Sequence, residues 1–297
     1  MRVILLGTGA ALVDPDRHQS AILVTTGGRH YLLDCGHGAT RQMVRAGVDP
    51  ATVDVVMLSH LHYDHIADFA FFMISTWMVG RQKPPIVIGP PGTRSFVDHL
   101  LAEGAFAKDI EARVQYPQRQ RNFNVLKPEV RECEPGVIYR DDAVTARACW
   151  VEHIPREISP CFGIRLDAAD GKSMVFSGDT APCERLVALA RDCDLLVHEC
   201  TFPEKAIEFR SRIGIGTWAH TSPTALGDIA VRARAKRLCA THFGHFDTTN
   251  AVLRKHLEKH MPIELVGPAF MEDVVDDIRR TYKGPLDIAR DLMRIDV

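Results

Sequence analysis

The chain has 297 residues, of which 46% are hydrophobic and 25% are charged, proportions typical of a globular protein with a sizeable core. Its formal net charge of −2 gives no overall basic field that would attract nucleic acid or an anionic membrane. Because the sequence opens without an apolar signal segment, and its most apolar stretch is too short to span a bilayer, we expect a cytoplasmic protein with no membrane contact.

Short apolar runs bounded by turn residues predict strands in the first third of the chain. Gly27 and Gly28 separate two of these runs and predict a hairpin. The predicted strands cover residues 1–6, 21–26, 30–34, 53–58 and 86–89. Helices are predicted over residues 38–46, 66–79 and 93–102.

The pattern then changes from strands to alternating helices and strands. Strands dominate from about residue 125 to 177, and helices are predicted at 204–210, 223–233 and 250–259, with strands at 195–197 and 237–241. Two β-rich stretches, each followed by helices, predict an α/β fold: two mixed sheets packed face to face with helices outside, an αββα sandwich. We expect a single domain over residues 1–297, with a helical insertion at 267–287 before the last strand.

Eight cysteines are present, and none forms a C-x-x-C pair. Most lie in apolar stretches, so we expect buried free thiols rather than disulfides or a thiolate metal site. Free thiols are consistent with a reducing compartment.

The densest group of potential metal ligands is the run from Ser59 to His65, which places three imidazoles and a carboxylate within six positions. It directly follows the predicted buried strand 53–58. Imidazole nitrogen and carboxylate oxygen are ligands that Zn²⁺ and similar metals prefer, and so many polar groups could not all find partners in a core. The run therefore predicts a metal-binding loop.

Further candidate ligands stand at the ends of predicted strands, where a rigid sheet would hold them. His153 closes an apolar run, and Asp179 and His242 each follow one. His198 and Glu199 follow the strand at 195–197. His198 is equally well explained as a structural residue that holds loops, and we do not count it as a ligand.

Together these residues resemble the ordered metal-ligand motifs of the metallo-β-lactamase superfamily. The matching motifs are His60-Leu61-His62-Tyr63-Asp64-His65, His153, Ser177-Gly178-Asp179-Thr180 and Thr241-His242-Phe243. Other motifs are similar to the ribonuclease Z group and its arylsulfatase-like relatives, namely Gly7-Thr8-Gly9-Ala10, Asp34-Cys35-Gly36-His37-Gly38, Gly89-Pro90-Pro91-Gly92-Thr93, His198-Glu199-Cys200-Thr201 and Ala219-His220-Thr221-Ser222. The resemblance covers nearly the whole chain and implies the metallo-β-lactamase fold.

The resemblance implies two metal ions, two Zn²⁺ per chain with Mn²⁺ or iron as alternatives. Carried over by position, one ion would be held by His60, His62 and His153, and the other by Asp64, His65 and His242, with Asp179 bridging. Two neighbouring cations can share one hydroxide, bring its pKa towards neutrality and stabilise charge on the attacking and leaving oxygens. Asp34 either orients a ligand imidazole or only pins its own glycine-rich turn.

The resemblance also implies catalytic residues. His220 would be the general acid that gives a proton to the leaving group, because imidazole titrates near pH 7, and Glu199 would orient it. Asp64 completes the predicted catalytic set. The alternative for His220 is a structural residue at a helix entry, hydrogen-bonded to Ser222.

Two features depart from the ribonuclease Z enzymes that process tRNA. Those enzymes carry a flexible basic arm before the bridging aspartate, whereas residues 167–172 form only a short turn with net negative charge. The ending Thr241-His242-Phe243-Gly244-His245-Phe246 also lacks the group's usual hydroxyl and arginine. Since phosphate neutralisation supplies much of the affinity for RNA, we expect a small-molecule substrate, with nucleic acid disfavoured as a partner but not excluded.

We therefore predict a metal-dependent hydrolase in which a hydroxide bridging two metals attacks an ester, sulfate ester, phosphodiester, lactone or activated aryl halide. One alternative is a ribonuclease Z-type endonuclease that processes tRNA 3′ ends. An alternative of another class is a non-catalytic metal-binding module, which the complete ligand set argues against. A homodimer is compatible with the sequence.

Three further features allow two interpretations each. Residues 69–79 form either a core helix or, with Trp77 and Trp218, the wall of an apolar pocket. The basic residues 113–131 form either a solvated loop or a contact for RNA. His37 and His245 either line the substrate pocket or lie away from it.

Overall fold

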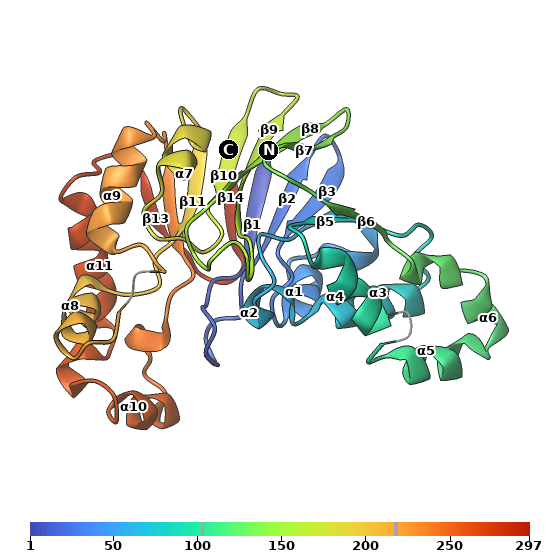
Figure 1. The fold of residues 1–297 in the computed structure, drawn as a ribbon, viewed down its shortest axis with the longest axis horizontal. Coiled ribbons are helices and arrows are strands. Elements are labelled where there is room, and N and C mark those ends of the chain that lie inside the picture. Colours follow the sequence, from blue (N-terminus) through green and yellow to red (C-terminus); the bar gives the residue numbers. More distant parts are fainter. Residues whose placement is uncertain (102–103, 217–218) are drawn as a thin grey trace.

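The computed structural model describes residues 1–101, 104–216 and 219–297. Two seven-stranded sheets pack face to face, and helices cover their outer faces (Figure 1). This arrangement confirms the predicted αββα sandwich.

The first sheet is mixed and has the strand order β14-β1-β2-β3-β4-β5-β6. Its strands are β1 (Arg2–Gly7), β2 (Ala21–Thr26), β3 (Arg29–Leu33), β4 (Val53–Met57), β5 (Ile86–Gly89), β6 (Glu129–Glu132) and β14 (Met293–Asp296). Gly27 and Gly28, both with positive φ, close the predicted hairpin between β2 and β3. From β3 to β6 the strands are parallel, so their C-terminal ends lie along one edge.

The second sheet is also mixed and has the order β13-β12-β11-β10-β9-β8-β7. Its strands are β7 (Gly136–Arg140), β8 (Val144–Trp150), β9 (Phe162–Ala168), β10 (Ser173–Phe176), β11 (Leu195–Glu199), β12 (Leu238–Thr241) and β13 (Leu286–Ile288). Strands β10 to β13 are parallel. Strand β13 begins at Leu286, inside the range 267–287, so that range contributes the start of a strand as well as a helix.

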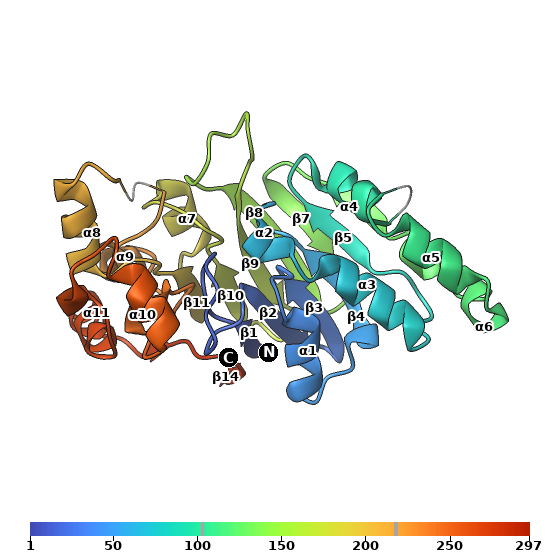
Figure 2. The same cartoon turned by 90° about the horizontal axis from the view of Figure 1, so that it is seen from below.

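Helices cover both sheets. They are α1 (Ala39–Arg45), α2 (Tyr63–Ile66), α3 (Phe69–Met78), α4 (Thr93–Leu101), α5 (Ala107–Val114), α6 (Pro117–Gln120), α7 (Glu184–Leu189), α8 (Glu204–Arg212), α9 (Pro223–Arg232), α10 (Ala251–Leu257) and α11 (Ala269–Arg279). Short 3₁₀ turns cover Pro50–Thr52, Phe123–Leu126, His245–Asp247 and Ile263–Leu265. Seen from below, α1 and α3–α6 lie on one side of the sheets and α7–α11 on the other (Figure 2).

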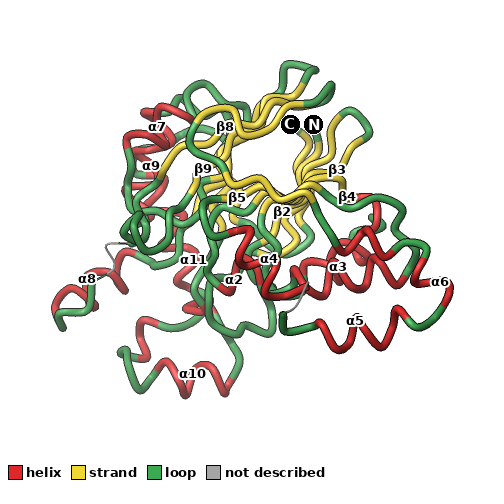
Figure 3. The backbone as a smooth tube through the Cα atoms, turned by 45° about the vertical axis from the view of Figure 1, so that its right-hand side comes forward, coloured by secondary structure: helices red, strands yellow, loops and turns green. Residues whose placement is uncertain are grey.

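The main hydrophobic core lies between the two layers of strands (Figure 3). Alternate residues of each strand point into it, and the rings of Trp150 and Phe162 stack with their centres 4.4 Å apart. A second core fills the space between the first sheet and helices α1, α3 and α4. Trp77 of α3 is 1% exposed and belongs to this second core, so it does not wall a substrate pocket.

The basic stretch 113–131 is not a solvated loop, contrary to that interpretation. It contains the end of α5, α6, a 3₁₀ turn and the start of β6. The Trp77 indole Nε1 donates to the Arg119 carbonyl oxygen at 3.2 Å, and Val125 is fully buried. The stretch folds against α3 because it supplies apolar anchors among its charges.

Two further expectations concern membranes and thiols. Within the described residues, no helix is long and apolar enough to cross a membrane. All eight cysteines are free, as predicted. Burial raises the pKa of Cys35 and of Cys200, which keeps these thiols protonated and unreactive.

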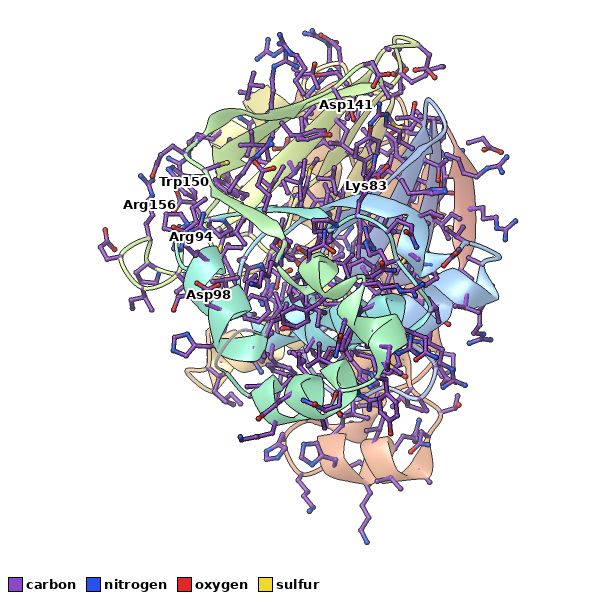
Figure 4. The ribbon with its side chains drawn as sticks, turned by 90° about the vertical axis from the view of Figure 1, so that its right-hand side faces the viewer. Lys83, Arg94, Asp98, Asp141, Trp150 and Arg156 are labelled. Carbon is purple, nitrogen blue, oxygen red and sulfur yellow. The ribbon has the colours of Figure 1, made fainter. Side chains whose placement is uncertain are left out.

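A hydrogen bond ties the two sheets together at the end opposite to α10. The buried Tyr31 hydroxyl of β3 donates to Asp141 Oδ2, 2.7 Å away at the β7–β8 turn (Figure 4). Tyr31→Phe removes this bond, so the free energy of unfolding should fall by about 1–2 kcal/mol in a denaturant titration. Tyr116→Phe, at an exposed position, should leave it unchanged; an equal loss in both variants would contradict the tie between the sheets.

Candidate metal centre

Loops at one edge of the two sheets carry all seven predicted ligands. The run from His60 to His65 follows β4 and includes α2, which lies at the lower edge of the sheets (Figure 1). His153 follows β8, Asp179 follows β10 and His242 follows β12. Because the strand ends hold these loops, residues that are far apart in the sequence meet at this edge.

Four of these residues form one group of potential metal ligands. The ligand atoms of this group, which lie within 4.8 Å of one another, belong to His60, His62, His153 and Asp179. His153 Nε2 is 3.2 Å from His62 Nδ1, and His60 Nε2 is 3.9 Å from Asp179 Oδ2. Three imidazoles and one carboxylate are a donor set that a zinc-like cation prefers.

A second group shares Asp179 with the first. Its ligand atoms also lie within 4.8 Å of one another and belong to Asp64, His65, Asp179 and His242. Asp179 Oδ1 is 3.4 Å from His65 Nε2 and 3.3 Å from His242 Nε2, whereas Oδ2 lies closer to His60 and His153. One carboxylate therefore presents an oxygen to each group, as a ligand shared by two cations would.

The inward-facing atoms of this cluster face one another or have no hydrogen-bond partner. Nδ1 of His65 and Nδ1 of His242 are each engaged outside the cluster, so their Nε2 atoms carry lone pairs, only 3.2 Å apart. The buried His60 Nε2 and Asp179 Oδ1 form no hydrogen bond within the described residues. Buried polar atoms are rarely left in this way, and cations between them would satisfy all four, so the residues fit a metal site.

Hydrogen bonds outside the cluster fix the ligand rings. The buried Asp34 carboxylate accepts from His65 Nδ1 at 2.6 Å, and from the Ser59 backbone N–H and hydroxyl at 2.7 and 2.8 Å. His153 Nδ1 donates to the Ala219 carbonyl oxygen at 2.9 Å. Such partners set the orientation and tautomer of a ligand imidazole. Asp34 thus contacts a predicted ligand and the start of the loop that carries it.

Unusual backbone conformations shape the loops of the site. Asp34 and His242 have φ values of 57° and 59°, a region that costs energy for residues other than glycine. Gly178 has a φ of 59°, and a Cβ there would lie 2.5 Å from the Phe162 carbonyl oxygen and 3.1 Å from Ser59 Cβ. Glycine at this position lets the loop that carries Asp179 pack against the histidine-rich loop.

Glu199, at the end of β11, connects to His220. Its buried Oε1 lies 3.3 Å from His220 Nδ1 and accepts from the Thr221 N–H at 2.8 Å. Oε2 accepts from the Thr201 hydroxyl at 2.9 Å. Burial would lower the pKa of His220, but the charge and hydrogen bond of Glu199 outweigh it and raise the pKa to about 9. Glu199 therefore favours the protonated ring and holds it by Nδ1, which leaves Nε2 for a bound molecule.

A cavity of about 460 Å³ opens beside the two ligand groups. Part of its lining is polar and consists of His62, Asp64, His153, Asp179, His220 and His242. Its apolar walls come from the segments around α8 and α10, which Figure 3 shows beyond the sheets, and include Phe202, Ile213, Ile215, Phe246, Leu257 and Met261. A mainly apolar cavity with converging polar groups is typical of a substrate site.

The remaining predicted residues differ in their distance from this cavity. His245 is 3% exposed and lines it, whereas His37 is exposed and lies outside it. His198 is buried, its Nδ1 donates to the Glu199 carbonyl oxygen, and it joins none of the ligand groups found among the described residues. Trp218 lies outside the described residues.

Sequence reasoning missed two residues of the site. The Thr201 hydroxyl lies within hydrogen-bonding distance of Glu199, His220 and His242, and its place in the motif at 198–201 was the available signal. Arg210 lines the cavity but carries no sequence signal, because its neighbours form no motif and only the path of α8 brings it there.

The chain is similar to proteins of known families. A family model described as Anti-Pycsar protein Apyc1 matches residues 1–209. Ribonuclease Z of Mycobacterium marinum is 35% identical over 248 residues, which cover 82% of this chain and 86% of that protein. Ribonuclease Z of Mycobacterium bovis is 30% identical over 302 residues, which cover 100% of this chain and 98% of that protein.

Two solved structures share the fold. The metallo-β-lactamase fold protein YhfI from Bacillus subtilis has a TM-score of 0.69 at 18% identity, over 99% of both chains. Human tRNase Z, short form, has a TM-score of 0.67 at 22% identity, over 100% of this chain and 99% of that chain. These likenesses confirm the metallo-β-lactamase fold.

The relatives overturn the expectation that nucleic acid is a disfavoured partner. That prediction was wrong, because relatives that match most or all of the chain at 30% identity or more are named as ribonucleases. It depended on the short turn at residues 167–172 in place of a basic arm and on the missing hydroxyl and arginine after His242. Phosphate contacts elsewhere on a protein can also supply affinity for RNA, so a single missing arm does not exclude it.

Asp34→Asn should weaken metal binding, because an amide lacks the charge that orients the His65 ring. We expect metal affinity to fall about 10- to 100-fold, measured by competition with a chelating dye. Asp54→Asn, at an exposed position of β4, is the matched control and should bind metal as the unmodified protein does. Undiminished affinity in Asp34→Asn would rule out the orienting role.

Proposed function

Because the chain belongs to the Anti-Pycsar protein Apyc1 family and to the ribonuclease Z branch of the metallo-β-lactamase superfamily, we propose that it cleaves phosphodiester bonds of a nucleic acid or nucleotide. It is a metal-dependent hydrolase, as its relatives and its clusters of histidine and aspartate indicate. The main support for phosphodiester cleavage is the position of Asp179 between two ligand groups, since paired cations suit attack on a phosphate.

We assign the metal ligands in two sets. One cation is assigned to His60, His62 and His153 and the other to Asp64, His65 and His242, with Asp179 shared. Two Zn²⁺ per chain are proposed, because donor sets rich in imidazole suit zinc; Mn²⁺ and iron are the alternatives. When bound, two such cations supply a nucleophile from water at neutral pH and offset the negative charge of the phosphate.

His220 is proposed as the general acid. Its Nδ1 faces Glu199 and Thr201, so Nε2 carries the proton that passes to the leaving oxygen. Glu199 favours the protonated ring through its charge and its hydrogen bond. Asp64 stays in the catalytic set as a carboxylate whose Oδ2 lies 3.3 Å from His242 Nε2, where it would fix the second cation.

Two substrate classes are candidates. The first is RNA, with processing of tRNA 3′ ends as the reaction that the resemblance implies and the relatives' names support. The second is a small phosphodiester, favoured by the cavity: at about 460 Å³ it falls within the range of small-ligand pockets. Both place a phosphodiester between the two ligand groups.

A substrate panel tests the proposal on the metal-loaded protein. We expect cleavage of bis(p-nitrophenyl) phosphate and of a 3′-extended tRNA precursor, with little hydrolysis of p-nitrophenyl sulfate or p-nitrophenyl acetate. RNA cleavage that falls steeply with rising salt would identify RNA as the substrate, and cleavage of the small phosphodiester alone would favour the second candidate. Hydrolysis of only the sulfate or the carboxylic ester would refute a phosphodiesterase.

His220→Ala should retain its metal but hydrolyse phosphodiesters more slowly, most of all those with poor leaving groups. A phenolate leaving group needs a proton more than p-nitrophenolate does, so we expect a loss of about 100-fold or more for phenyl esters and a smaller loss for p-nitrophenyl esters. His60→Ala, the contrasting variant, should lose metal and activity together. Elemental analysis and steady-state kinetics check both, and equal slowing for the two leaving groups would remove His220 from the proton transfer.

A further inference from the structure

An arginine side chain lines the substrate cavity away from the proposed metal ligands. Arg210, on α8, is the single lysine or arginine among the described residues that line it. Its Nη2 donates to the Gly216 carbonyl oxygen at 3.2 Å, and no carboxylate of the described residues pairs with it.

The guanidinium also holds a donor without an acceptor. Its buried Nε has no hydrogen-bond partner among the residues that the structure describes. Burial lowers the pKa of Arg210, yet an arginine keeps its charge in proteins. A partly buried charge with an unmet donor is costly unless an anion joins it, so the site is suited to a negatively charged part of a bound molecule.

Phe202 lies next to both this charge and the proposed general acid. The Arg210 guanidinium carbon lies 4.8 Å from the centre of the Phe202 ring. The same ring lies 5.5 Å from the His220 ring and 5.6 Å from the Phe246 ring. Arg210 and the group that would protonate the leaving oxygen therefore share Phe202 as a neighbour. Phe202 and Phe246 both line the cavity and offer a stacking surface for a base.

We propose that Arg210 binds a second phosphate of the substrate, one nucleoside away from the phosphate that is cleaved. This role rests on the proposed phosphodiesterase function and specifies its substrate class: a nucleotide with phosphates on both sides of a nucleoside that packs against Phe202 and Phe246. Guanidinium suits this role because its planar donors bind two phosphate oxygens at once. The second phosphate is either an internal diester of a strand or a terminal monoester, and both present the same oxygens.

Substrates that differ only in a second phosphate test this role. One pair is the p-nitrophenyl ester of thymidine 5′-phosphate with and without a 3′-phosphate; the other is the p-nitrophenyl ester of thymidine 3′-phosphate with and without a 5′-phosphate. With metal-loaded protein, the second phosphate should lower KM about tenfold in one pair. Converting the second phosphate to its methyl diester shows which form Arg210 binds. If the methylated substrate keeps the lower KM, the natural second phosphate is an internal diester; if the lower KM is lost, it is a terminal monoester.

In Arg210→Gln the second phosphate should no longer lower KM. Glutamine is chosen because it preserves the helix propensity of the position. Arg212→Gln is the matched control, because Arg212 is exposed on the same helix with its guanidinium over Phe209, and it should keep the lower KM. An undiminished lowering of KM in Arg210→Gln would overturn the second-phosphate site. An equal fall in kcat for every substrate would also overturn it, since Arg210 would then act at the reacting phosphate.

A binding measurement keeps this test independent of turnover. In calorimetric titrations, the metal-loaded protein should bind thymidine 3′,5′-bisphosphate about tenfold more tightly than either thymidine monophosphate, and Arg210→Gln should bind all three alike. Equal affinities in the unmodified protein would overturn the second-phosphate site. Tighter binding of the bisphosphate without any phosphodiester cleavage would instead refute the proposed function, so the two failures are distinguishable.

Discussion

The buried carboxylate of Asp179 is the constraint on which the site depends. It presents one oxygen to His65 and His242 and the other to His60 and His153. The imidazoles around it turn their Nδ1 atoms outward to fixed partners, as His65 does to Asp34, so lone pairs and carboxylate oxygens converge on the same space. Like charges and unmet acceptors in a buried space are unfavourable, and a pair of cations would relieve both. Metal binding and the stability of this edge of the fold are therefore coupled.

The sandwich supplies the rigidity that this convergence requires. Parallel strands in both sheets end at one edge, and the packed core between the sheets fixes their spacing. Local strain is accepted at the loops, where Asp34 and His242 hold left-handed conformations, because the strands on either side determine their positions. The segments around α8 and α10 supply the apolar walls of the cavity, and the proposed metal ligands are part of its polar lining.

The sequence was sufficient to predict the αββα fold. It also singled out seven candidate ligands whose side chains the structure brings together, because these residues stand in motifs at strand ends. Features that depend on tertiary packing have no motif in the sequence from which they could be predicted. An aromatic helix has the same pattern in a core and in a pocket wall, and only the fold places Trp77 in the core. The many charged residues of the stretch 113–131 predicted a solvated loop, so the burial of Val125 was not predicted. Arg210 reaches the cavity only because of the path of α8. The prediction on nucleic acid failed because the absence of a basic arm was taken to mean that the protein has no affinity for RNA.

The central claim is that two cations bind on either side of Asp179. The most direct measurement is a crystal structure of protein purified without chelator, with anomalous data collected at the absorption edge of the bound metal. The account predicts two anomalous peaks, one among His60, His62 and His153 and one among Asp64, His65 and His242, each in contact with a different oxygen of Asp179. A single peak, or peaks that leave Asp179 without contact to metal, would contradict it.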